Sequence, residues 1–142
     1  MVRDGRDVLV SYAHYARAHG YHAELESFED TLRMLATSEK HFGGWSENIR
    51  SWIDRKGPTV IVHFEDLVEN PEMVVKNAFS ELGVDVGFTG KSIPSFEILK
   101  KKMPHFFRSG KVGGWCQEMT PEIESEFWHH HGHMMERLGY DR

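Results

Sequence analysis

Residues 59–64 read Thr-Val-Ile-Val-His-Phe, and they form the clearest strand signal in the chain. The run is short, rich in β-branched side chains and apolar at nearly every position, and the turn residues Gly57-Pro58 precede it. This composition is typical of a strand buried on both faces in a parallel sheet. A strand alone leaves its backbone N–H and C=O groups unpaired. Its partner strands must therefore come from residues 1–2, from weaker strands elsewhere, or from chain outside these 142 residues.

Most of the remaining chain has the apolar spacing of amphipathic helices. A helix is predicted over 7–19, with Asp7 as its N-cap. Further helices are expected after the capping-box variant Ser27-Phe28-Glu29-Asp30, over 45–53, from Asn70-Pro71 to Gly83, over 96–102, and from Thr120-Pro121 to about Leu138. Trp45 and Trp52 share a helix face and are expected in the core, while residues 84–92 are expected to form a loop. No repeat, linker or domain boundary is visible, so we expect one domain.

The composition indicates a globular protein with a local anion site. Hydrophobic residues make up 39% of the 142 positions and charged residues 27%, which excludes a disordered chain. Since the net charge is −5, no general attraction to nucleic acid is expected, and the cations instead cluster at residues 100–111 and at Arg3 and Arg6. No apolar run has the length of a membrane span, so no membrane partner is expected. The single cysteine, Cys116, excludes an internal disulfide and favours a cytoplasmic location.

Residues 103–115 read Met-Pro-His-Phe-Phe-Arg-Ser-Gly-Lys-Val-Gly-Gly-Trp and combine several ligand-binding side chains. Arg108 and Lys111 supply cations, Ser109 a hydroxyl, and the glycines allow close approach of the backbone. Phe106, Phe107 and Trp115 supply flat apolar surface. These are the parts needed to bind a group that has both phosphates and a ring. The alternative is a surface loop with a solvated basic run.

A second anion-binding half is predicted near the N-terminus. Arg3 precedes the first predicted helix, and Ser11 is expected in its first turn or just past it, near the positive end of the helix dipole. Arg3 with Ser11 would form one half of a cage and Arg108-Ser109-Gly110 the other, because arginine forks and hydroxyls match phosphate geometry. The alternative for Ser11 is a serine simply tolerated within a helix.

Other catalytic and metal-binding patterns are incomplete. The histidines at 129, 130, 131 and 133 include an i, i+4 pair that could bind zinc, but HExxH and a completing carboxylate or cysteine are lacking. A histidine-rich metal module therefore remains the third hypothesis, against a solvated or partly buried histidine cluster. The GxSxG, GxGxxG and P-loop patterns do not occur in these residues.

The residues at both ends of the chain resemble the cytosolic-type sulfotransferases that use 3′-phosphoadenosine 5′-phosphosulfate (PAPS). The C-terminal signature of that family, RKGxxGDWK, is matched by Arg108, Gly110, Gly113 and Trp115. Serine at 109, glycine at 114 and cysteine at 116 depart from it. Arg3 and Ser11 have the spacing of the arginine and serine that hold the 3′-phosphate in the family.

Two intermediate segments extend the resemblance, which runs in register from residue 2 to about 140. His63-Phe64-Glu65-Asp66-Leu67, followed by Asn70-Pro71, resembles a family segment in which Phe64 takes the place of an adenine-contacting tyrosine. Pro94-Ser95-Phe96 resembles the threonine-serine-phenylalanine that approaches the purine.

The resemblance implies an α/β, P-loop-like sulfotransferase fold, in which helices flank a parallel sheet. Residues 1–142 would be an N-terminally truncated, mostly helical portion, a partial domain that lacks the 5′-phosphosulfate-binding segment. The lysine of that segment and the family's histidine base have no counterpart here, so no catalytic residue is expected in this chain, and no metal is implied. The expected cofactor-binding residues are Arg3, Ser11, Phe64, Ser95, Phe96, Phe106, Phe107, Arg108, Ser109 and Gly110.

The implied function is transfer of a sulfuryl group from PAPS to a hydroxyl or amine of a small-molecule acceptor. This chain would supply the 3′-phosphate and adenine subsite. The alternative is a truncated, non-catalytic remnant that still binds the nucleotide. The acceptor stays open, and so does the oligomeric state, because only Thr120 clearly matches the family's dimer motif over 116–125.

Overall fold

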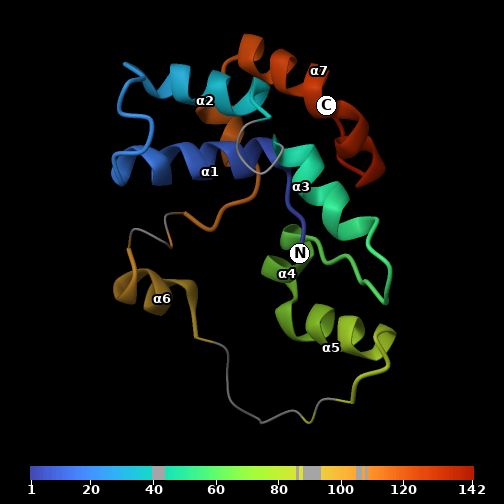
Figure 1. Cartoon of the computed structure of the whole chain (residues 1–142). Helices are drawn as coiled ribbons and strands as arrows, with labels where there is room; N and C mark the ends of the chain where they lie inside the picture. The colour runs from blue at the N-terminus through green and yellow to red at the C-terminus, as the bar shows by residue number, and fades with distance from the viewer. Residues whose placement is uncertain (40–43, 86, 88–93, 105–106, 108) are drawn as a thin grey trace.

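The structure is a computed structural model of the chain. It describes residues 1–142 except 40–43, 86, 88–93, 105–106 and 108. The helices are α1 (Gly5–Ala18), α2 (Phe28–Thr37), α3 (Gly44–Ile53), α4 (Phe64–Glu69), α5 (Pro71–Glu81), α6 (Phe96–Lys102), the 3₁₀ helix η1 (Gly114–Gln117) and α7 (Pro121–Arg137). Figure 1 shows α1, α2, α3 and α7 in its upper part and α4, α5 and α6 below them. No helix of the described chain is long and apolar enough to cross a membrane.

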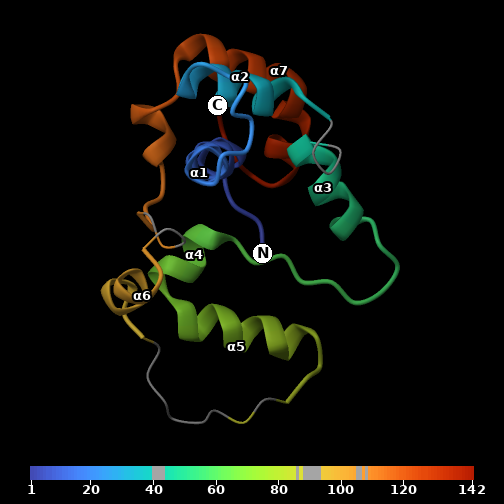
Figure 2. The ribbon, with the colours of Figure 1, turned by 60° about the vertical axis from the view of Figure 1, so that its left-hand side comes forward.

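The core lies where α1, α2 and α7 pack against one another, as Figure 2 shows with α1 seen nearly end-on. Its largest fully buried side chains are Phe127, Leu32, Ile123, Met135, Val10 and Thr31. Gly5 allows the first turn of α1 to approach this core closely, because a Cβ there would lie 2.5 Å from the Phe127 ring and 2.8 Å from Trp45. Helices α1, α2 and α7 therefore bury their apolar faces against one another.

The N-terminal caps of the helices are partly as predicted. Ser27 and Asp30 form both bonds of the predicted capping box of α2, and the Thr120 side chain caps α7. The predicted cap of α1 is wrong, since Asp4 is its N-cap and accepts from the backbone N–H of Arg6. Asp7 is instead buried within the first turn, where its carboxylate has other partners. The helix therefore starts earlier than its apolar spacing indicated.

Two predicted apolar faces are more exposed than expected. Trp45 is buried, but Trp52 of the same helix is 60% exposed, so the prediction of two core tryptophans is wrong for Trp52. The predicted apolar side of α5 is also only partly covered, since Val75 and Leu82 are exposed and the helix contains no buried residue. The physical reason is that α5 packs mainly on α4 within the described chain, so its apolar face meets little of the core.

The strand predicted over 59–64 forms only one parallel bridge, between Val2 and His63. The N–H of Val2 donates to the C=O of Val62 at 2.8 Å, and the N–H of Phe64 donates to the C=O of Val2 at 2.8 Å. Residues 1–2 therefore pair with the segment 59–64, and they are one of the three sources of partner strands expected from the sequence. Burial on both faces is wrong for this chain, because Ile61 is 42% exposed. The helix α4 begins at Phe64, and no sheet forms among the described residues, because Val2 pairs over a single position.

Candidate functional site

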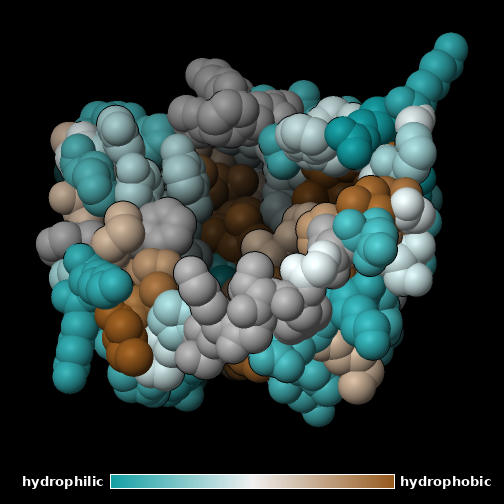
Figure 3. Space-filling model, turned by 90° about the horizontal axis from the view of Figure 1, so that it is seen from below, coloured by the Kyte–Doolittle hydropathy of each residue, from teal (hydrophilic) through white to brown (hydrophobic). Residues whose placement is uncertain are grey.

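A cavity of about 1090 Å³ lies between α1, α4, α6 and the segment that follows α6. Figure 3 shows the lower face of the molecule, which is hollowed and has apolar residues inside the hollow. Seven of the predicted nucleotide-binding residues line this cavity: Arg3, Ser11, Phe64, Phe96, Phe107, Ser109 and Gly110. A mostly apolar cavity with a few converging polar groups is typical of a small-ligand site.

Of the other three predicted residues, only Ser95 is described, and it is not among the described residues that line the cavity. Ser95 is the N-cap of α6, and its hydroxyl accepts from the N–H of Ile98 at 3.5 Å. Helix capping is therefore sufficient to explain why a serine occupies position 95. Phe106 and Arg108 lie outside the described residues.

Arg3 reaches across to the segment 109–115 from the turn before α1. Its Nη2 donates to the C=O of Lys111 at 2.7 Å and lies 3.2 Å from Oδ2 of Asp7. The guanidinium carbon lies 4.4 Å from the centre of the Phe64 ring, a cation–π contact. Its Nε is buried and has no hydrogen-bond partner in the described chain.

Ser11 presents an unused hydroxyl to the cavity. The side chain lines the cavity and makes no hydrogen bond with any described residue. Because α1 begins at Gly5, Ser11 lies in its second turn, just past the first, which is one of the two placements expected from the sequence. The predicted help from the helix dipole therefore does not apply, since that effect fades beyond the first turn. Any anion at Ser11 would depend on the hydroxyl and on Arg3.

The aromatic part of the cavity is built around Phe96, at the start of α6. The rings of Phe96 and Phe107 meet edge to face with their centres 6.1 Å apart. Gly110 lies against the Phe96 ring with a φ of +62°, and a Cβ there would approach the ring to 2.6 Å. Glycine is required at 110 for both reasons, since its backbone is left-handed and its neighbour is a ring.

Asp7 fixes the position of the segment 109–115, and no sequence signal indicated this role. Its Oδ2 accepts from the N–H of Gly113 at 2.9 Å, and its Oδ1 accepts from the N–H of Trp115 at 3.0 Å. The Asp7 side chain is only 2% exposed, so these are buried, charge-assisted hydrogen bonds. The partners lie more than 100 residues away, which local capping rules cannot detect.

Arg6 secures the end of the same segment from the other side of α1. Its guanidinium stacks on the Trp115 ring with 4.0 Å to the centroid, and its Nη2 donates to Oδ2 of Asp4 at 2.8 Å. A second carboxylate, that of Glu124, accepts from Nη1 at 3.3 Å. Burial alone would lower the pKa of Arg6, but the hydrogen bonds and charges of Asp4 and Glu124 raise it. Arg6 is thus a structural cation and not a free ligand-binding one.

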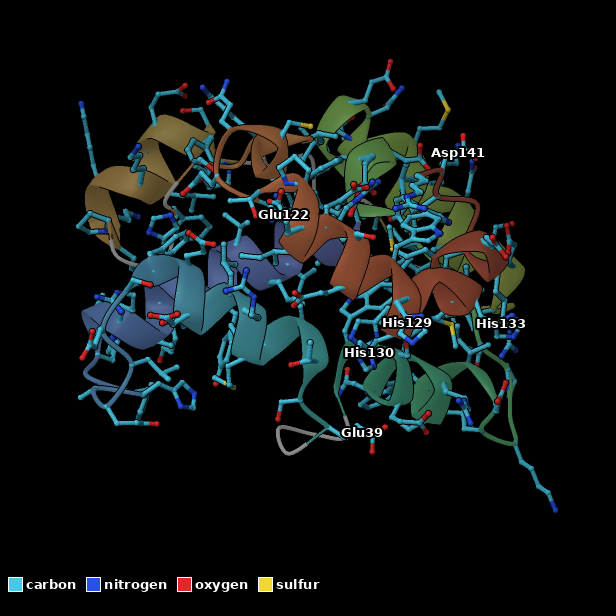
Figure 4. The ribbon with its side chains drawn as sticks, turned by 90° about the horizontal axis from the view of Figure 1, so that it is seen from above. Glu39, Glu122, His129, His130, His133 and Asp141 are labelled. Atoms are coloured by element: carbon cyan, nitrogen blue, oxygen red, sulfur yellow. The ribbon has the colours of Figure 1, made fainter. Side chains whose placement is uncertain are left out.

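The histidines of α7 do not converge on a metal site. His129, His130 and His133 are exposed along α7 in Figure 4, with Glu122 at the other end of the helix. His131 is buried, and its Nδ1 shares a hydrogen bond with the Ser46 hydroxyl at 2.8 Å. Burial, and to a lesser degree the neighbouring His130, lowers the pKa of His131 to about 4. The described residues contain no group of three metal-ligating side chains.

Comparisons with known proteins point to one family. Among curated proteins, mouse Sulfotransferase 1A1 is 23% identical, in an alignment that covers 95% of this chain and 54% of that protein. Sulfotransferase 1E1 of Bos taurus is 26% identical, in an alignment that covers 94% of this chain and 52% of that protein. The chain therefore spans about half the length of the curated relatives that it matches.

A solved structure shares the arrangement of the helices. The crystal structure of mouse sulfotransferase SULT7A1 complexed with PAP matches with a TM-score of 0.75 at 23% identity, over 94% of this chain and 56% of that chain. This likeness shows the sulfotransferase fold, although the described part of this chain is mostly helical and contains only the isolated bridge of Val2. The family model described as "Sulfotransferase domain" matches residues 1–139, and the chain therefore belongs to the sulfotransferase family.

Proposed function

We propose that this chain forms the 3′-phosphate and adenine subsite of a PAPS-dependent sulfotransferase. The whole enzyme would transfer a sulfuryl group from PAPS to a hydroxyl or amine of a small-molecule acceptor. The observation that carries the proposal is the convergence of Arg3, Ser11, Ser109 and Gly110 with three phenylalanines in one cavity. The structural relative complexed with PAP supports it, because it shares the fold over 94% of this chain.

The polar side of the cavity suits a phosphate. Arg3 provides a guanidinium with a buried Nε that has no partner in the described chain, and Ser11 and Ser109 provide hydroxyls. A phosphate oxygen accepts hydrogen bonds from both kinds of donor, and such bonds to an anion are stronger than neutral ones. Arg108 is proposed to add a second cation, on the basis of its match to the family signature.

The apolar side of the cavity suits a purine. Phe64 lies under the Arg3 guanidinium, while Phe96 and Phe107 line the cavity from α6 and from the segment after it. Aromatic rings of this kind can stack on a base or meet it edge to face. The two sides together fit an adenosine that carries a phosphate on its ribose.

The role of these residues in sulfuryl transfer would be to hold the nucleotide. Binding the 3′-phosphate and adenine fixes the far end of PAPS, so that the sulfuryl group is presented in line to the acceptor. No residue of this chain is assigned to the chemical step. A metal is not required by this scheme, since the charges are met by arginine, hydroxyl and backbone donors.

Calorimetry with adenosine 3′-phosphate, adenosine 5′-phosphate and adenosine tests the proposal. We expect the 3′-phosphate to raise affinity over adenosine by about tenfold or more, through one or two charge-assisted hydrogen bonds. The 5′-phosphate should add less, because the described cavity residues are assigned to the other phosphate. Equal affinity for the two monophosphates would refute the assignment of the subsite.

A transfer assay separates the enzyme from the non-catalytic alternative. Sulfuryl transfer from PAPS by the purified chain would exclude a remnant that only binds the nucleotide. Nucleotide binding without transfer would exclude independent catalysis by this chain and leave the binding role intact.

A further inference from the structure

We infer that Asp7 is a positioning residue of the nucleotide site. Its carboxylate holds the segment 109–115 and the Arg3 guanidinium in one arrangement, so that phosphate-binding groups from two distant parts of the chain meet. This inference rests on the proposed function and adds a residue that does not touch the ligand.

The geometry requires a group that only accepts hydrogen bonds. Two N–H groups donate to Asp7, that of Gly113 at 2.9 Å and that of Trp115 at 3.0 Å, and Nη2 of Arg3 forms an ion pair with it at 3.2 Å. The side chain is 2% exposed, so water contributes little. An ionised carboxylate accepts from both N–H groups and attracts the guanidinium, whereas an amide would lose the charge and turn its NH₂ group toward one of the N–H groups.

Arg3 and the loop backbone are tied to each other as well as to Asp7. The same Nη2 of Arg3 donates to the C=O of Lys111 at 2.7 Å. Arg3, Asp7 and the segment from Lys111 to Trp115 thus form a closed set of contacts. Ser109 and Gly110, which line the cavity, directly precede that segment. Loss of the carboxylate would therefore release both the cation and the loop.

A charge role and a positioning role of Asp7 predict opposite effects on phosphate binding when the carboxylate is removed. This difference makes the inference testable. An anion beside Arg3 weakens the attraction of that guanidinium for a phosphate. If Asp7 acted only as a charge, its removal would tighten phosphate binding. If it acts by positioning, its removal weakens phosphate binding despite the more favourable charge.

The experiment compares the variant Asp7→Asn with the unaltered chain by calorimetry, using adenosine 3′-phosphate and adenosine as probes. We expect the affinity for adenosine 3′-phosphate to fall by about tenfold, as for the loss of a charge-assisted contact, with a much smaller change for adenosine. Asp4→Asn is the matched control, because it alters another buried carboxylate in the same turn that pairs with Arg6. This control should lower stability and keep the ratio of the two affinities.

The outcomes separate the inference from the proposed function. The unaltered chain is expected to prefer adenosine 3′-phosphate over adenosine. If Asp7→Asn retains or strengthens this preference, the inference alone is overturned. Absence of that preference in the unaltered chain removes the proposed function and the inference together.

Hydrogen exchange in the unaltered chain provides a second measurement if Asp7→Asn does not fold. The N–H groups of Gly113 and Trp115 bind Asp7, and neither residue is among those that line the cavity. Adenosine 3′-phosphate should slow the exchange of these two amides, because it steadies Arg3 and hence the shared carboxylate. Adenosine should leave their exchange unchanged. The same effect from both ligands, or no effect from either, would contradict the inference.

Discussion

Replacing Gly110 or Gly113 by alanine should have different costs, although both glycines are left-handed. Their φ angles are +62° and +72°, so alanine at either position should cost about 1–2 kcal/mol of backbone strain. At Gly113 the new Cβ would meet no atom within 4 Å. At Gly110 it would lie 2.6–3.0 Å from three carbons of the Phe96 ring, and this overpacking should add about 1–3 kcal/mol. We therefore expect a loss of about 1–2 kcal/mol for Gly113→Ala and about 2–5 kcal/mol for Gly110→Ala.

Urea unfolding of the two variants measures these losses, and adenosine binding reports the consequence for the site. The Phe96 ring must move to admit the Gly110→Ala methyl group, so that variant should bind adenosine more weakly. Gly113→Ala retains the N–H that donates to Asp7 and should bind adenosine as the unaltered chain does. Equal stability losses, or unchanged adenosine binding by Gly110→Ala, would refute the assigned contact between Gly110 and Phe96.

Three further predictions concern a buried histidine, a signature arginine and a half-buried tyrosine. The pKa of His131 is about 4 in the folded chain and 6.5 ordinarily, so as the pH falls the proton binds the unfolded state first. The free energy of unfolding should therefore be unaffected above pH 6.5 and fall by about 3 kcal/mol as the pH drops to 4. Urea unfolding across that range should show the loss in the unaltered chain and not in His131→Gln, and parallel curves would contradict it. Arg108→Ala should weaken binding of adenosine 3′-phosphate by about 1.5–3 kcal/mol in calorimetry, and unchanged affinity would exclude the phosphate contact. Tyr140→Phe should lose about 1.5–3 kcal/mol of unfolding free energy, because its hydroxyl donates to Oε2 of Glu65 at 2.9 Å; unfolding at the same urea concentration would argue against this.

Local sequence signals predicted local structure well. The capping box of Ser27 and Asp30 and the Thr120-Pro121 start of α7 both depend on residues within one turn of each other. Helix α6 has the bounds expected from its sequence, Phe96–Lys102. These features follow from neighbouring residues, so a single sequence contains the information that they need.

Features that depend on distant partners could not be read in the same way. Asp4 and Asp7 are both suitable N-caps, and the choice between them is made by Arg6 and by a loop more than 100 residues away. Trp52 has the helical spacing of a core residue, but spacing does not reveal whether another element covers that face. The segment 59–64 likewise has the composition of a buried strand. Only additional partner strands would bury both of its faces.

The candidate site was found by resemblance more than by chemistry. The spacing of Arg3 and Ser11 and the signature around Gly110 identified residues that now line one cavity. Composition alone could not choose between an anion loop and a solvated basic run. The anchoring role of Asp7 was missed because its carboxylate contacts backbone groups, which no side-chain pattern reveals.

The packing of α7 on α1 and α2 has a consequence for synthesis on the ribosome. Nη2 of Arg6 donates to the C=O of Asp141 at 2.8 Å, and α7 covers α1 and α2. At about 5–20 residues per second, α1 and α2 therefore emerge several seconds before the helix that completes their core. During that interval the apolar faces of both helices are open to chaperones, so the nascent chain should be a stronger chaperone client than the finished protein.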